Sequence, residues 1–166
     1  MLRHLVAYRV LYGSGVPAGP RGLCCAPDGA VRVCENKDLS ICVARCVEDA
    51  AIAQAAPAVV APKRLEQTSK FTCSPVKVPA ANRQIIQPFV NGAVVDAAGF
   101  TYVSRGGVQR PSCVQVYRPD GSHFIDLAPP AAAVPFDNPR GLCLHNGLLY
   151  ICDAHCSRIV VYGAPS

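Results

Sequence analysis

The sequence lacks tryptophan, is poor in charged residues and has no long hydrophobic run. Only 16% of its 166 residues are charged while 51% are hydrophobic, which excludes disorder as the overall state of the chain. No segment reaches the roughly 20 apolar residues that a membrane-spanning helix needs. Prolines interrupt the two most apolar segments, at Pro57, Pro62, Pro129, Pro130 and Pro135. We therefore expect a soluble protein with no membrane span, built as a single domain over residues 1–166.

The motifs of common catalytic sites are missing as well. No serine stands in a Gly-x-Ser-x-Gly elbow, and none of the 4 histidines recurs at corresponding strand starts. We assign no catalytic residue and expect no cofactor, so the sequence favours a function other than catalysis.

The 10 cysteines raise the question of a metal site or a disulfide framework. The segment at 152–156, Cys-Asp-Ala-His-Cys, has the residue types of zinc ligands, but it lacks a Cys-x-x-Cys pair and a second pair at zinc-site spacing. A disulfide framework would require export, for which the sequence carries no clear signal. We expect no metal site, and we interpret the cysteines in strands as small buried hydrophobic side chains.

Proline and glycine are abundant, at 15 and 13 residues, which favours many short elements separated by turns. The same pentapeptide, Pro-Arg-Gly-Leu-Cys, occurs at residues 20–24 and 139–143, so that Gly22 matches Gly141. Each copy is followed by a tight turn, at Gly29 or Gly147, which is typical of a β-hairpin. Two cysteine pairs also match across the copies, Cys24 with Cys143 and Cys34 with Cys152.

A looser third copy lies between these two. It begins at Asn91 and Gly92, turns at Gly99, and continues into strand-like runs at 101–104 and 113–117. A further turn at 118–122 leads into 123–127, which could be a fourth strand. The sequence therefore predicts three repeat units, at about 20–46, 89–127 and 138–163, each an antiparallel meander of three or four strands.

These units resemble the NHL repeat family, whose repeats run from a Pro-x-Gly start through a glycine turn to a strand ending in Asp and a strand beginning with Arg. The third unit follows this pattern closely and carries the family-like pair Asp153 and Arg158. The first unit has Glu35 in place of the acid, and the middle unit is expected to have Ser104 there. The resemblance implies a β-propeller that binds RNA or proteins, with lyases and lactone hydrolases as a minority of relatives.

The number of units is too small for a closed propeller, which has about four to eight blades. The fold class that we expect is all-β and β-propeller-like, with NHL-type blades and a partial ring of three to four blades. Residues 47–87 form either a linker with an outer strand or a degenerate blade. An N-terminal strand at 4–12 could supply the missing last strand, although the same segment is also compatible with an organelle transit peptide. Cytoplasmic and organelle localisation both stay open.

The rim of the predicted blades carries the candidate binding residues Arg21, Asn91 and Arg140, which stand just before the first strand of each unit. Two guanidinium groups on one rim would favour phosphate or carboxylate. We expect a scaffold module that binds a protein partner or forms a homo-oligomer, because open blade edges need a neighbour.

Two alternatives remain. A net charge of +5 is compatible with an RNA-binding face, although 6 tyrosines and 5 phenylalanines without tryptophan supply few aromatic platforms. The second alternative is a degenerate lyase-like or lactonase-like enzyme.

Overall fold

The computed structural model describes residues 20–36, 38–48, 63–76, 87–127, 129 and 134–163, and its regular structure there consists of strands alone. The first sheet contains β1 (Pro20–Cys25), β2 (Val31–Glu35), β3 (Ser40–Glu48) and β4 (Lys63–Thr72). The second contains β5 (Phe89–Val95), β6 (Thr101–Gly106), β7 (Cys113–Tyr117) and β8 (His123–Leu127). The third contains β9 (Pro139–His145), β10 (Leu148–Asp153) and β11 (Arg158–Gly163). The all-β expectation is confirmed, and within these ranges no helix could cross a membrane.

Each sheet is an antiparallel meander in which strands adjacent in sequence pair with each other. The turn between β9 and β10 shows why the sequence folds this way. Asn146 and Gly147 both have positive φ, 49° and 73°, which is the conformation of the two-residue turns that match the twist of a hairpin. The predicted fourth strand at 123–127 is β8, and residues 63–72 form β4 at the edge of the first sheet.

The three sheets share one irregularity of register, which aligns the repeats in space. The pairing of the first two strands shifts between Pro20 and Gly22 in the first sheet and between Val90 and Gly92 in the second. The third sheet has the same shift, again with the extra residue on the first strand: Ile151 and Asp153 of β10 pair with Leu142 and Pro139 of β9. The repeat detected in the sequence is therefore also a repeat of hydrogen-bond register.

This register corrects one expectation about the middle unit. Glu35 pairs with Pro20 and Asp153 pairs with Pro139, whereas the residue in the same place of the second sheet is Arg105. Ser104 stands one residue earlier, at the place of the repeat cysteines. The expectation that Ser104 occupies the position of the acid is wrong, and a buried arginine stands there instead.

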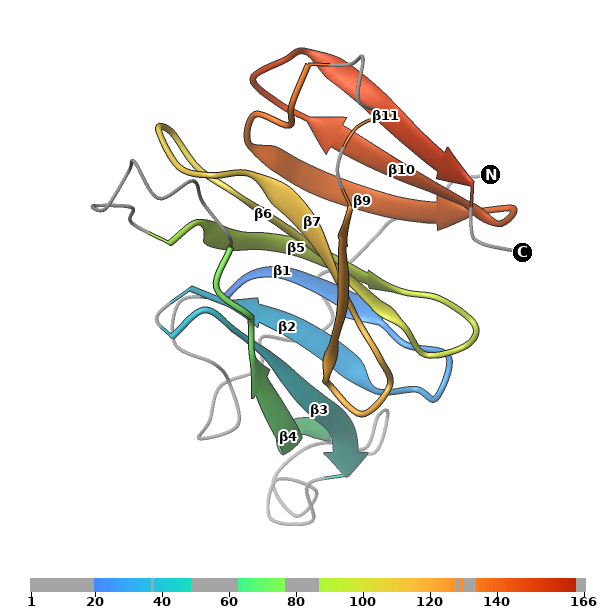
Figure 1. The fold of residues 1–166 in the computed structure, drawn as a ribbon. Coiled ribbons are helices and arrows are strands. Elements are labelled where there is room, and N and C mark those ends of the chain that lie inside the picture. Colours follow the sequence, from blue (N-terminus) through green and yellow to red (C-terminus); the bar gives the residue numbers. More distant parts are fainter. Residues whose placement is uncertain are drawn as a thin grey trace, which may run out of the picture.

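The sheets are stacked, with the second between the first and the third, as Figure 1 shows. Strand β5 lies between β1 and β9, so the first strands of the three sheets are neighbours. One apolar cluster joins the first and second sheets: Cys34, Ile41, Cys73, Val90, Ala93, Val103 and Tyr117. Another joins the second and third: Tyr102, Val114, Val116, Phe136, Leu149 and Ile151.

Glycine at the register shift lets these first strands approach to backbone contact. A Cβ atom added to Gly22 would lie 2.7 Å from the carbonyl oxygen of Asn91, and one added to Gly92 would lie 2.6 Å from that of Arg140. Both distances are shorter than any real side chain tolerates, so the stacking of the sheets requires glycine at these two repeat positions.

The hypothesis of an N-terminal strand at 4–12 concerns residues outside the described ranges. The same holds for residues 49–62 and 77–86 of the predicted linker.

Candidate interaction surface

The three rim candidates have different surroundings. The side chain of Arg21 is exposed, and its guanidinium carbon lies 4.9 Å from the centroid of the Phe89 ring. The guanidinium carbon of Arg110 lies 4.1 Å from the centroid of the same ring. Arg110, which was not among the candidates from the sequence, therefore shares this aromatic contact with Arg21. Asn91 donates from Nδ2 to the carbonyl of Pro139 at 3.0 Å and thereby links β5 to β9. Arg140 is exposed, and its carbonyl faces the second sheet.

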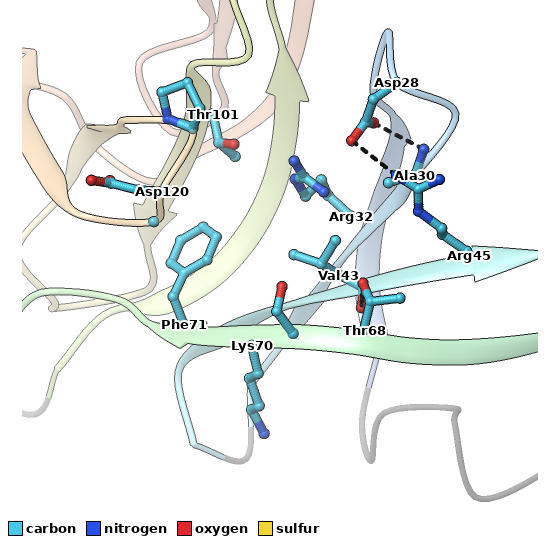
Figure 2. A pocket seen from close by; sticks show the side chains of 13 residues that line it. Asp28, Ala30, Arg32, Val43, Arg45, Thr68, Lys70, Phe71, Thr101 and Asp120 are labelled. Carbon is cyan, nitrogen blue, oxygen red and sulfur yellow. Dashed lines mark hydrogen bonds and ion pairs between the residues drawn. The ribbon is translucent and has the colours of Figure 1, made fainter.

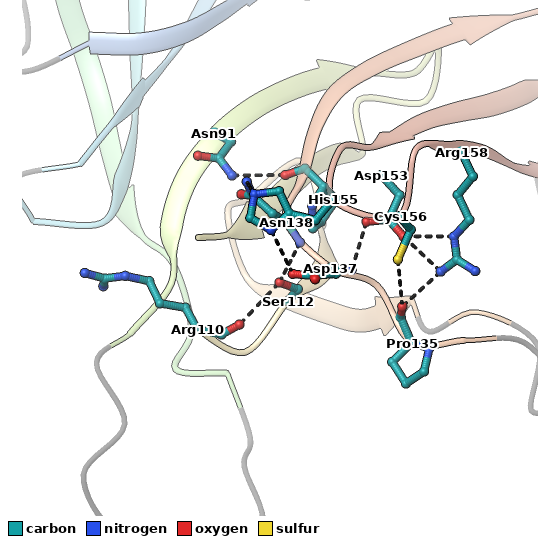
Figure 3. Close-up of polar contacts among 11 residues, drawn as sticks. Asn91, Arg110, Ser112, Pro135, Asp137, Asn138, Asp153, His155, Cys156 and Arg158 are labelled. Carbon is teal, nitrogen blue, oxygen red and sulfur yellow. Dashed lines mark hydrogen bonds and ion pairs between the residues drawn. The ribbon is translucent and has the colours of Figure 1, made fainter. Parts of the chain in front are cut away.

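The family-like pair Asp153 and Arg158 forms a structural tie, shown in Figure 3. Oδ1 of the fully buried Asp153 accepts a hydrogen bond from the backbone amide of Asp137 at 2.8 Å, and Oδ2 accepts one from Nε of Arg158 at 2.9 Å. Nη2 of Arg158 donates to the carbonyls of Val134 and Pro135. The pair therefore fixes the segment before β9 against the turn between β10 and β11.

The corresponding residues of the other sheets are also buried and have partners. Oε2 of Glu35 accepts from Nζ of Lys70 at 2.9 Å, and hydrogen bonds to Asp38 and Glu35 raise the pKa of Lys70. Arg105 donates to Gln115 and to two backbone carbonyls. These charged groups stabilise their own sheets and lack the exposure of binding residues.

The face of the third sheet that carries Gly141 differs sharply from its counterparts. In the first and second sheets, the face with Gly22 or Gly92 packs against the next sheet. In the third sheet, strand alternation places six residues on this side, which we call the Gly141 face: Gly141, Cys143, Tyr150, Cys152, Ile159 and Val161.

Burial of equivalent residues shows that the Gly141 face has no neighbour among the described residues. Ile41 and Val114 are 0% exposed in the first two sheets, whereas Ile159, at the same place in the third, is 58% exposed. Val116 is buried, but its counterpart Val161 is 50% exposed. The third sheet thus has the apolar side chains of a packed face without the packing.

The repeat cysteines also differ in exposure between the first and third sheets, and this corrects the expectation that they are buried. Cys34 is fully buried, so the thiolate is poorly solvated and the pKa of its thiol is raised, and Cys24 is half-buried. Cys143 and Cys152, which match them in the repeat, are exposed. The interpretation of all four as buried hydrophobic side chains is therefore wrong for the third sheet.

The opposite end of the stack shows a complementary exposure. Leu142 of β9 packs against the cluster between the second and third sheets. Leu23 holds the same place in the identical pentapeptide of β1, yet it is 70% exposed on the outer side of the first sheet. Leu23 is thus exposed at this end of the stack, whereas Val33 and Cys42, which lie beside it on the same side of the sheet, are buried.

No group of three His, Cys, Asp or Glu side chains in the described ranges could hold a metal ion. His155 contacts Asp137 at 3.3 Å and Asn138 at 3.1 Å, beside the Asp153 tie.

No family model matches the chain, and no curated protein matches it.

Proposed function

We propose that the chain is an assembly module, an open arc of three NHL-like propeller blades that a second copy of the same chain completes. The observation that supports this most strongly is the difference in burial between equivalent residues. Ile41 is covered by a following sheet, and Ile159 lacks such a sheet in the described part of the chain.

Two features of the sheets support the proposal that they are propeller blades. Each is an antiparallel meander of three or four strands, and their first strands lie side by side. Propellers contain about four to eight blades, so an arc of three blades is an open ring. Two arcs of three would make a ring of six within this range, and a closed two-fold ring leaves no free face.

The identical pentapeptides indicate which surface of the second copy covers the Gly141 face. Residues 139–143 of β9 pack against the second sheet, with the Arg140 carbonyl oxygen directly over Gly92. Residues 20–24 of β1 have the same sequence, and Leu23 among them is 70% exposed on the outer side of the first sheet, where its neighbours Val33 and Cys42 are buried. In the proposed ring, the Arg21 carbonyl of one copy lies over Gly141 of the other, and Leu23 packs as Leu142 does.

The exposed apolar residues favour this contact. Complete burial of a valine or isoleucine side chain contributes about 1.5–3 kcal/mol. Ile159 and Val161 are each about half exposed in the single chain, so covering both contributes about 2 kcal/mol. Leu23 adds to this, and the two-fold ring contains the contact twice.

Charged substitutions on the two ends test the proposal by sedimentation velocity. Leu23→Asp alters the outer side of the first sheet, and Ile159→Asp alters the Gly141 face. We expect each to convert the dimer to a monomer. Val108→Asp is the matched control, because Val108 is 68% exposed in the loop between β6 and β7 and should leave the dimer intact.

Mixing the two disrupted variants sharpens the result. In a ring of two arcs, a mixed pair retains one interface with native residues on both sides, so equimolar Leu23→Asp and Ile159→Asp should recover a dimer. If Leu23→Asp alone leaves a dimer that Ile159→Asp abolishes, the two copies meet through their Gly141 faces and the proposed ring is wrong.

A further inference from the structure

A cavity of about 290 Å³ lies between the first and second sheets, on the side away from the third. Six of its lining residues matter for what it can hold: Arg32, Val43, Ser69, Phe71, Thr101 and Pro119. Figure 2 shows Arg32 reaching into the space between Thr101 and Phe71, whereas Lys70 points away from it. The cavity is near the lower end of the size range of small-molecule sites, about 300 Å³.

Arg32 is the unusual group in this cavity. Its residue is only 8% exposed, and Nε and Nη1 of its guanidinium are enclosed without a hydrogen-bond partner in the described part of the chain. A buried cation without partners is costly, so such groups normally have an acceptor. A bound anion would supply the acceptor that these two nitrogens of Arg32 lack.

The repeat shows that the fold itself does not require an arginine here. Tyr102 holds the same place in the second sheet, and its hydroxyl donates to Oδ2 of Asp96 at 3.0 Å. The counterpart of that aspartate is Ala26, because Gly29 and Gly99 donate the same turn hydrogen bond, to the carbonyls of Ala26 and Asp96, and an alanine side chain offers no acceptor. At this repeat position the second sheet has a tyrosine whose hydroxyl is hydrogen-bonded within the chain. The first sheet has a cation, Arg32, whose Nε and Nη1 have no such partner among the described residues.

We propose that this cavity binds a small carboxylate with an apolar or aromatic body, which Arg32 holds by its guanidinium. Val43, Phe71 and Pro119 supply apolar walls for the body. Hydroxyl side chains line the cavity as well, so the carboxylate oxygens have further donors close to Arg32.

The charges around the cavity favour a monoanion over a phosphate. Asp28 and Asp120 both line it, and Asp28 lies 3.8 Å from Arg45, which lines it as well. Oδ1 of Asp120 accepts from the backbone amide of Ser122 at 2.8 Å. Two carboxylates would repel a phosphate dianion more strongly than a carboxylate.

This inference goes beyond the assembly module, since the cavity lies within one chain. The two proposals can fail separately, because the Ile159→Asp variant removes the dimer while leaving every residue that lines the cavity unchanged.

Nuclear magnetic resonance of the ¹⁵N-labelled chain tests the site, with benzoate as the probe. We expect benzoate to shift the Nε–H signal of Arg32 and the backbone amides of Thr101 and Gly121 in a saturable way. Benzyl alcohol keeps the aromatic body without the charge and should bind at least about tenfold more weakly, because a hydrogen bond to a charged group contributes about 1.5–3 kcal/mol. Arg32→Met should weaken benzoate to the same extent.

The wild-type titrations decide the matter even if Arg32→Met does not fold. Equal shifts with benzoate and benzyl alcohol, or no saturable shift at the Arg32 Nε–H, would overturn the proposal. Shifts with inorganic phosphate but none with benzoate would overturn the assignment to a carboxylate.

Discussion

Replacement of Gly92 by alanine is the most direct probe of how the sheets stack. The new Cβ atom would lie 2.6 Å from the carbonyl oxygen of Arg140, against an ordinary contact distance of 3.4 Å or more. This oxygen is held in place, because it accepts a hydrogen bond from Oγ of Ser104 at 2.6 Å. The second and third sheets must therefore separate by several tenths of an ångström, which loosens the apolar cluster between them.

Overpacking of this kind costs about 1–3 kcal/mol of unfolding free energy. For a chain of this size, each kcal/mol lowers the melting temperature by about 2–4 °C. Gly141→Ala is the matched control, since its Cβ would lie 3.5 Å from Sγ of Cys152, an ordinary contact. Both variants gain equally from the lower entropy of the unfolded chain, so their difference isolates the clash.

Far-ultraviolet circular dichroism is the suitable assay, because the chain has no tryptophan. Thermal unfolding is compared at a concentration at which both variants are monomeric. We expect Gly92→Ala to melt well below Gly141→Ala. Equal melting temperatures would refute the close stacking of β5 and β9.

Two further predictions concern the buried ionisable groups. Asp153→Ala should destabilise the chain by about 3 kcal/mol, since it removes a fully buried partner of Arg158. Asp137→Ala removes an exposed ion pair with His155 and should lower the free energy of unfolding by less than about 1 kcal/mol. Similar urea midpoints for the two variants would contradict a stabilising contact between Asp153 and Arg158. Stability should also fall between about pH 9 and pH 12: burial raises the pKa of Cys113 from 9.0, and that of Tyr102 from 10.0, to about 12 in each case. The unfolded chain releases these protons at a lower pH than the folded chain, so rising pH favours unfolding. The Cys113→Val variant should show a smaller fall in the urea midpoint over this pH range. A urea midpoint that rises with pH would contradict this assignment.

Much of the fold follows from local signals in the sequence. The pentapeptide at 20–24 and 139–143 and the turns at Gly29 and Gly147 predict the strands and hairpins, because turn chemistry depends on a few neighbouring residues. Asp153 and Arg158 were also recognisable in the sequence as a family-like pair. These features all depend on residues close together along the chain.

The sequence could not show which faces are covered. Cys34 and Cys152 are the same residue type at the same repeat position, and only the stacking of the sheets makes one buried and the other exposed. The sequence also could not show that Arg105 stands at the repeat position of Glu35 and Asp153. This depends on the register shift between β5 and β6, which moves the alignment of the repeats by one residue. Arg32 gave one unused signal, a charged residue where the other two units have tyrosine.

The mass of the particle in solution tests the central claim most directly. One chain has a mass of 17.5 kDa. Light scattering across a range of concentrations should approach twice this value and no more, because a ring of two arcs has no free face left to extend it. A particle that keeps the mass of one chain at every concentration, or grows without limit, would contradict the account.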